Sequence, residues 1–322
     1  MSSGHHHLQL AEALAGTFTV HLMDRRGRGL SGPYRDDHDI ARDVEDLEAV
    51  LAATGARNVF AVSAGALIAM QAALTLPVIE RLALFEPLLF PDRVTGARVM
   101  ARYDRELAEG KVAAALATAM KGAQLGPASL NAMPHWLLTA MTKGMESRMP
   151  EGDYPSFTEL AAALHYEGHL ITVMSDRPDA FRDIRASVLL IGGGKGSALL
   201  KNALARVAEA VPDAARVELP GLDHSSTWNK ELRGDPEPVA RVLLGFLAPG
   251  DPGRAAQASA PPVTDLLAGM IAVLAHLGRP EDADLFRLAW CGQAACERCP
   301  ECKACDLHSW AVAEDGRDST HA

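Results

Sequence analysis

A serine at the junction between an apolar strand and a helix is the residue best placed to do chemistry. Residues 58–62 form a short apolar run, Ser63 follows, and residues 64–76 are almost wholly apolar and have the length of a helix. This strand–serine–helix order is the setting of a nucleophile elbow, in which a strained turn exposes the hydroxyl and small neighbours let the backbone pass. The usual pentapeptide is G-x-S-x-G, and Ala61 replaces its first glycine. The pentapeptide alone leaves open a serine that merely caps the helix.

Two histidines have a spacing that could hold a metal ion. His165 and His169 are four residues apart, on either side of Glu167, and in a helix this spacing puts two imidazoles on one face. Gly168 lies between them and is expected to interrupt the helix, because glycine is a poor helix former. The sequence therefore does not favour a metal site at this pair.

All five cysteines lie in one short segment. They are Cys291, Cys296, Cys299, Cys302 and Cys305, in the pattern C-x4-C-x2-C-x2-C-x2-C. Structural zinc sites usually separate two C-x2-C pairs by a dozen or more residues. Bacterial iron–sulfur runs end in x3-C-P, whereas this run ends in Cys305–Asp306. Two readings stay open, namely free or oxidised thiols and a zinc ion held by Cys296, Cys299, Cys302 and Cys305.

The elements that must position these residues alternate between strand and helix. Strands are predicted for short apolar or β-branched runs at residues 17–23, 58–62, 81–85, 187–191 and 216–219. Helices are predicted from apolar spacing at residues 8–15, 40–54, 64–76, 198–211 and 238–247. This alternation is typical of an α/β protein with a mostly parallel sheet that helices cover on both faces.

The pattern changes in the middle of the chain to one helix after another. Residues 90–183 show no clear strand and hold seven of the eleven methionines. We expect a helical cap at about residues 92–183 within a domain of residues 1–247, then a Pro/Gly/Ala-rich linker at 248–262 and a helical, cysteine-rich tail at 263–322. The methionines indicate either a flexible apolar pocket wall or ordinary packing of the cap helices.

Composition excludes several classes of protein. The chain has 322 residues, of which 48% are hydrophobic, so it can bury a sizeable core. Its formal net charge of -10 argues against a nucleic-acid partner, because such proteins usually present a basic face. No apolar run reaches the roughly 18 residues of a membrane span, and the first residues lack the pattern of a secretory signal. We expect a cytoplasmic protein in which the histidines at residues 5–7 lead into the first helix rather than mark a tag.

Three loops that follow predicted strands resemble loops of the α/β-hydrolase superfamily. Residues 24–31, DRRGRGLS, are similar to its D-x-R-G-x-G-x-S loop, and residues 85–87 (FEP) and 219–224 (LPGLDH) are similar to loops after later strands. The order nucleophile, cap, strand, strand and histidine is also that of the superfamily. The resemblance covers about residues 5–247 and implies an α/β-hydrolase fold.

The resemblance also implies acyl transfer on an ester or a related small, apolar or acyl substrate, without a cofactor. Ser63 would attack the carbonyl, and His224 would take the serine proton and return it to the leaving group. The backbone N–H of Ala64 would donate to the oxyanion. A solvated loop histidine is the alternative reading of His224.

The acid that would orient the histidine departs from the family pattern. Residues 192–197, GGGKGS, occupy its usual place and contain no carboxylate. Glu86 occupies the family's alternative position, after the strand that follows the nucleophile, and is the tentative acid. Asp223 adjoins His224 but is a weaker candidate, because neighbouring side chains usually diverge. A Ser–His dyad without an acid is also open.

A second departure concerns the strands that the family places before its first helix. One of them ends in a His-Gly loop that supplies the other oxyanion donor, and the loss of such a donor costs about 10²–10³ in rate. The sequence starts directly before that helix, so we expect these N-terminal strands to be missing. The explanations left open are a start set too late, a decayed relative, or a variant that pairs residues 17–23 directly with residues 58–62. The alternative function is a non-catalytic α/β-hydrolase-like protein whose tail binds a metal or a partner.

Overall fold

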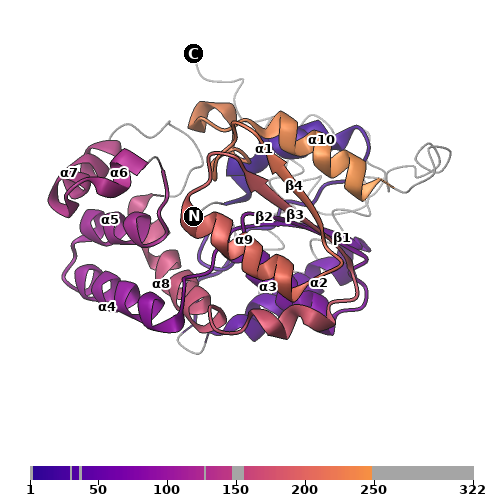
Figure 1. Ribbon diagram of the computed structural model, residues 1–322, viewed down its shortest axis with the longest axis horizontal. Helices are drawn as coiled ribbons and strands as arrows, with labels where there is room; N and C mark the ends of the chain where they lie inside the picture. The colour runs from indigo at the N-terminus through magenta and orange to yellow at the C-terminus, as the bar shows by residue number, and fades with distance from the viewer. Residues whose placement is uncertain (1–2, 30, 36–37, 127, 147–155, 249–322) are drawn as a thin grey trace, which may run out of the picture. The chain divides into compact units, whose positions relative to one another are not determined.

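The computed structural model describes residues 3–29, 31–35, 38–126, 128–146 and 156–248 (Figure 1). The predicted tail with all five cysteines lies outside the described residues, and so does the predicted linker beyond residue 248. None of the helices in the described ranges combines the length and the apolar character that crossing a membrane requires.

Within the described residues, four parallel strands form one sheet in the order β1-β2-β3-β4. They are β1 Asn58–Val62, β2 Arg81–Phe85, β3 Ser187–Gly193 and β4 Ala215–Leu219, all within two residues of their predicted bounds. Phe85 pairs with Val62 on one side and with Ile191 on the other, so these neighbouring strands run level with one another. The residues that follow β1 and β2 therefore meet at the carboxyl end of the sheet, where α/β proteins usually carry their sites.

Helices cover both faces of this sheet, as predicted (Figure 1). One face carries α1 Leu8–Ala15 and α10 Pro236–Leu247, and the other carries α3 Ala64–Thr75 and α9 Ala198–Ala210. The remaining predicted helix, α2 Ile40–Thr54, has the bounds that its apolar spacing indicated. Beneath α1 and α10, alternate residues of the central strands pack with the apolar stripes of both helices. This cluster contains Leu10, Leu14, Ala83, Phe85, Leu189, Ile191, Leu222, Val239, Ala240, Leu243 and Leu247.

The prediction of a strand at residues 17–23 is wrong. These residues have no regular secondary structure, and within the described chain β1 has a strand neighbour only on its β2 side. A strand needs a hydrogen-bonded neighbour, and the described residues offer none to this segment, neither β1 nor another strand. Phe18 and Val20 still pack against the cluster beneath α1 and α10. Their burial explains the apolar alternation that favoured a strand.

A helical insertion separates β2 from β3 at the residues expected for the cap. It contains α4 Arg93–Ala108, α5 Val112–Gly122, α6 Ala128–Ala132, α7 His135–Glu146 and α8 Phe157–Met174, followed by the 3-10 turn η2 Pro178–Asp183. Gly168 does not interrupt α8, contrary to expectation. A Cβ at Gly168 would collide with the sulfur of Met100 on α4, so the glycine is needed for the close packing of the two helices. Met100 and Met174 are buried in this packing.

A buried ion cluster, made of Arg25, Arg28, Asp43 and Glu167, joins the loop after α1 to the helical insertion. Arg25 and Arg28 each place a guanidinium nitrogen 2.7 Å from Oε1 of Glu167 on α8. Arg25 also lies 3.3 Å from Asp43 on α2. Burial alone would raise the pKa of Glu167, but the charges of Arg28 and Arg25 outweigh it and hold this pKa well below its usual range. Glu167 is therefore ionised and ties α8 to this loop.

The N-terminal residues Gly4–His7 form a 3-10 turn that leads directly into α1. The backbone N–H of Asn229 donates to His6 O at 2.8 Å, and its side-chain amide donates to His5 O at 2.7 Å. His6 is buried, and His7 Nδ1 lies 2.9 Å from Thr227 O. Burial lowers the pKa of His6 and His7 from 6.5 to about 4.

These two histidines are expected to make stability depend on pH. The unfolded chain binds more protons than the folded one between the folded pKa of about 4 and the unfolded value of 6.5. The free energy of unfolding is therefore greatest above that window and falls as the pH falls through it. We expect a loss of about 2 kcal/mol per histidine between pH 7 and pH 5, measured by urea unfolding. The His6→Asn, His7→Asn double variant should show a flatter dependence, and an unchanged slope would contradict this assignment.

Candidate active site

Ser63 lies in the turn between β1 and α3 and has a strained backbone. Its φ of 57° and ψ of -123° fall in a region that residues other than glycine rarely adopt. The backbone N–H of Ser63 donates to Phe85 O at 3.0 Å, which holds the turn against β2. The Ser63 hydroxyl does not cap α3, and within the described part of the chain it makes no hydrogen bond. The capping alternative is therefore not supported, and the turn has the geometry of a nucleophile elbow.

Glu86 and His224 come together at the carboxyl end of the sheet. Nδ1 of His224 lies 2.8 Å from Oε2 of Glu86, and the Glu86 side chain is only 2% exposed. Because a carboxylate only accepts hydrogen bonds, this contact selects the neutral tautomer that has its proton on Nδ1 and its lone pair on Nε2. A histidine held in this tautomer can act as a general base through Nε2.

The glycine-rich run after β3 surrounds the Glu86 carboxylate. The backbone N–H of Gly193 donates to Oε1 of Glu86 at 3.0 Å. A Cβ on Gly196 would lie 2.5 Å from the same oxygen. Glu86 itself has a φ of 44°, a conformation that a non-glycine residue adopts only where its surroundings impose it. The glycine-rich run at residues 192–197 contains no acid, but it holds the Glu86 carboxylate, which follows the neighbouring strand β2. This role of the run was not predicted from the sequence.

Gly196→Ala is expected to push the Glu86 carboxylate away from His224. Gly196 has no positive φ, so alanine can adopt its backbone and the effect is steric. We expect a loss of about 1–3 kcal/mol in the free energy of unfolding by urea. Gly245→Ala in α10 is the matched control, because a Cβ there meets no atom within 4 Å. Equal stability of the two variants would contradict the steric account.

The competing acid Asp223 is engaged in its own loop. Its Oδ1 accepts hydrogen bonds from the backbone N–H of Ser225 at 2.9 Å and from Ser225 Oγ at 2.7 Å. Within the described residues, the carboxylate that contacts the His224 imidazole is that of Glu86. The geometry therefore favours Glu86 over Asp223, and over a dyad without an acid.

Ala64 is the first residue of α3 and is buried. Its backbone N–H has no acceptor inside the helix, and the helix dipole favours a negative charge at this end. These properties suit the expected oxyanion donor. The strand that carries the second donor in the family pattern has no counterpart within the described residues.

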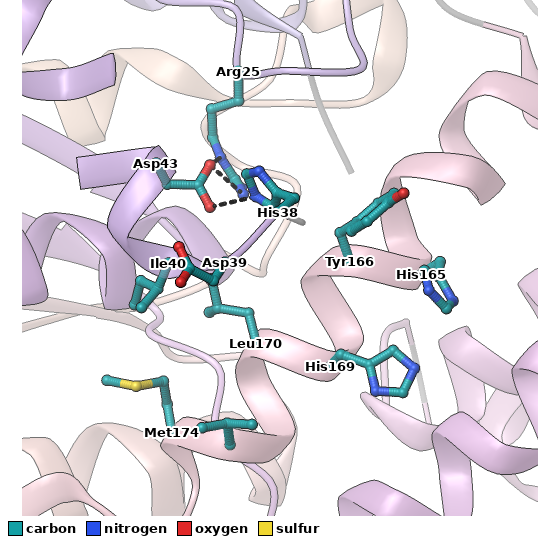
Figure 2. A pocket seen from close by; sticks show the side chains of 11 residues that line it. Arg25, His38, Asp39, Ile40, Asp43, His165, Tyr166, His169, Leu170 and Met174 are labelled. Atoms are coloured by element: carbon teal, nitrogen blue, oxygen red, sulfur yellow. Dashed lines mark hydrogen bonds and ion pairs between the residues drawn. The ribbon is translucent and has the colours of Figure 1, made fainter. Parts of the chain in front are cut away.

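A cavity of about 430 Å³ lies between α8 and the first turns of α2 (Figure 2). Its polar wall includes Arg25 and Asp43 of the buried ion cluster, and its apolar wall includes Leu170 and Met174. Ser63, Glu86 and His224 do not line it. The cavity is therefore a feature separate from the three side chains described above.

The parallel sheet with helices on both faces, the strained serine after β1 and the histidine–carboxylate pair at the carboxyl end define a protein of the α/β-hydrolase fold. The family model described as "Alpha/beta hydrolase family" matches residues 1–242. The chain belongs to this family, as the resemblance predicted, and membership supports a hydrolase-type function.

Solved structures agree with this assignment. An alpha/beta hydrolase from Sphaerobacter thermophilus has 30% identity and a TM-score of 0.59, and the match covers 77% of this chain and 90% of that chain. MenH from S. aureus has 15% identity and a TM-score of 0.55, with 76% and 89% covered. A hydrolase from Pseudomonas aeruginosa has 21% identity and a TM-score of 0.52, with 77% and 88% covered. The last two show the fold alone. No curated protein matches the chain.

Proposed function

We propose that the protein is a serine-dependent hydrolase that cleaves an ester or a related acyl substrate. The observation that carries the proposal is the contact between His224 Nδ1 and the buried Glu86 carboxylate, at 2.8 Å. A buried carboxylate that orients a histidine is what a general base for a serine nucleophile requires. Ser63 lies in a strained turn whose backbone N–H donates to Phe85 O, directly before Glu86.

Each of the proposed residues has one task. His224 Nε2 accepts the proton of Ser63 as its Oγ attacks the carbonyl, and Glu86 stabilises the imidazolium that forms. The Ala64 N–H donates to the oxyanion. The imidazolium then returns the proton to the leaving alcohol, and the acyl group stays on Ser63. Water, activated by His224 in the same way, releases the acid.

The helical insertion is proposed to act as the cap over this site and to favour a small apolar or acyl substrate. Of its methionines, Met100 and Met174 are buried by packing, whereas Met141 is 41% exposed. Exposed apolar side chains on such helices are what a flexible pocket wall would use. In the same proposal residues 1–247 form the catalytic domain, and a linker joins it to the cysteine-rich tail.

A fluorophosphonate probe tests the proposal directly, because it reacts only with an activated serine. Covalent labelling of the folded chain, followed by mass spectrometry, should place the probe on Ser63. The Ser63→Ala variant should lose the label, while Ser197→Ala, which removes a serine that caps α9, should keep it. A folded wild-type chain that takes no label would favour the non-catalytic alternative.

A further inference from the structure

Three side chains that can ligate a metal meet where α4 packs on α8. Asp104 comes from α4, and His165 and His169 come from α8. His165 Nδ1 lies 2.7 Å from Asp104 Oδ1, and His169 Nε2 lies 2.8 Å from Asp104 Oδ2. One ligand atom from each residue lies within 4.8 Å of the other two. Figure 2 shows the two imidazoles on the same side of α8.

The continuity of α8 creates this cluster. Because α8 runs unbroken from Phe157 to Met174, side chains four residues apart lie one above the other on one face. Gly168 lies between the two histidines in sequence and makes room for Met100, which lets α4 approach. The residue expected to prevent a metal site is thus the one that brings Asp104 within reach of both imidazoles.

The cluster is accessible and its donors are of the right kind. The side chains of His165, His169 and Asp104 are 41%, 49% and 32% exposed, so an ion can reach them from solvent and keep water as a further ligand. Two imidazole nitrogens and one carboxylate oxygen form a ligand set that zinc accepts. Magnesium, in contrast, prefers an all-oxygen octahedral set.

We propose that Asp104, His165 and His169 bind a zinc ion on the surface of the helical insertion, with water in the fourth position. Zinc bonds of about 2.0–2.2 Å place tetrahedral ligand atoms about 3.3 Å apart. The contacts of 2.7 Å and 2.8 Å go to the two different oxygens of Asp104, and the three ligand atoms lie within 4.8 Å of one another. Rotation of these partly exposed side chains would bring one carboxylate oxygen and both nitrogens to the separation that zinc requires. The bound ion would clip α4 to α8, and this proposal does not depend on the proposed hydrolase activity.

Zinc titration of the full chain tests this site once the thiols are removed. The parent carries serine in place of all five cysteines, so that the tail cannot supply ligands. Isothermal titration with Zn²⁺ should show one equivalent bound to the parent, with a Kd at least about 100-fold lower than in His169→Ala or Asp104→Asn, because each variant loses a ligand. Excess Mg²⁺ should not displace the zinc. His135→Ala is the matched control, since His135 lies 3.8 Å from Glu106 in a histidine–carboxylate contact of the same insertion.

Thermal unfolding provides a second readout that needs no calorimetric signal. Zinc should raise the Tm of the parent and of His135→Ala, and should leave the Tm of His169→Ala and Asp104→Asn unchanged. These side chains are partly exposed, so the variants should fold, and their Tm without zinc checks this. If the parent binds no zinc, or if the ligand variants bind it as tightly, the proposal is overturned and the three side chains form only a hydrogen-bonded link.

Discussion

Ser63→Ala is expected to lower kcat/KM for hydrolysis of a short-chain p-nitrophenyl ester by about 10⁴–10⁶-fold. The reason is that the acyl intermediate can no longer form, and the remaining rate comes only from substrate binding and from the oxyanion donor. The assay follows release of p-nitrophenol under conditions in which both proteins are folded, as checked by circular dichroism.

The partner variant His224→Ala gives the internal control for this expectation. In the proposed mechanism Ser63 and His224 act as a unit, so each single variant and the double variant should reach a similar residual rate. Losses that add up in the double variant would mean that the two residues act independently, and an active Ser63→Ala variant would remove the serine from the mechanism.

Glu86→Gln is expected to lower kcat by about 10³–10⁴-fold with little change in KM. The amide keeps the shape of the side chain, but its NH₂ group can donate to Nδ1 of His224 and so favour the tautomer in which Nε2 carries the proton. The lone pair that takes the proton from Ser63 in the proposed mechanism is then lost.

Asp223→Asn serves as the matched control for the acid. The Asp223 carboxylate accepts hydrogen bonds from Ser225 rather than from His224, so its neutralisation should change kcat by less than about tenfold. If Asp223→Asn is as slow as Glu86→Gln, then the geometry in the free protein does not describe the working site.

Sequence patterns located the elements and the residues of the candidate site, because those depend on local features. Strands β1 and β2 are apolar runs bounded by polar residues, and they have the predicted bounds. Ser63 and His224 were proposed from the loops after strands. The strand predicted at residues 17–23 did not form. An alternating apolar pattern indicates that one side of a segment is buried, but it does not indicate whether another strand lies beside the segment to form hydrogen bonds.

Contacts between segments that lie far apart in the sequence could not be predicted from it. The choice of Glu86 over Asp223 rests on the contact of Glu86 with His224, which lies 138 residues further along the chain. In the same way, the pairing of His165 and His169 with Asp104 depends on how closely α4 packs on α8, and Gly168 was read as a helix breaker instead of a contact point. Helix propensity predicts that a glycine destabilises a helix, but it does not show that a packed neighbour, here Met100, leaves no room for a side chain at that position.

The buried ion cluster limits how the helical insertion can open. A swing of the whole insertion away from the sheet domain would separate Glu167 on α8 from Arg25 and Arg28 at once. Breaking these buried contacts carries an electrostatic cost, so the arrangement in which Glu167 contacts both arginines is favoured. In the proposed hydrolase, opening of the insertion as one rigid body is therefore disfavoured. A motion of its other helices, with α8 held in place, would leave these ion pairs intact.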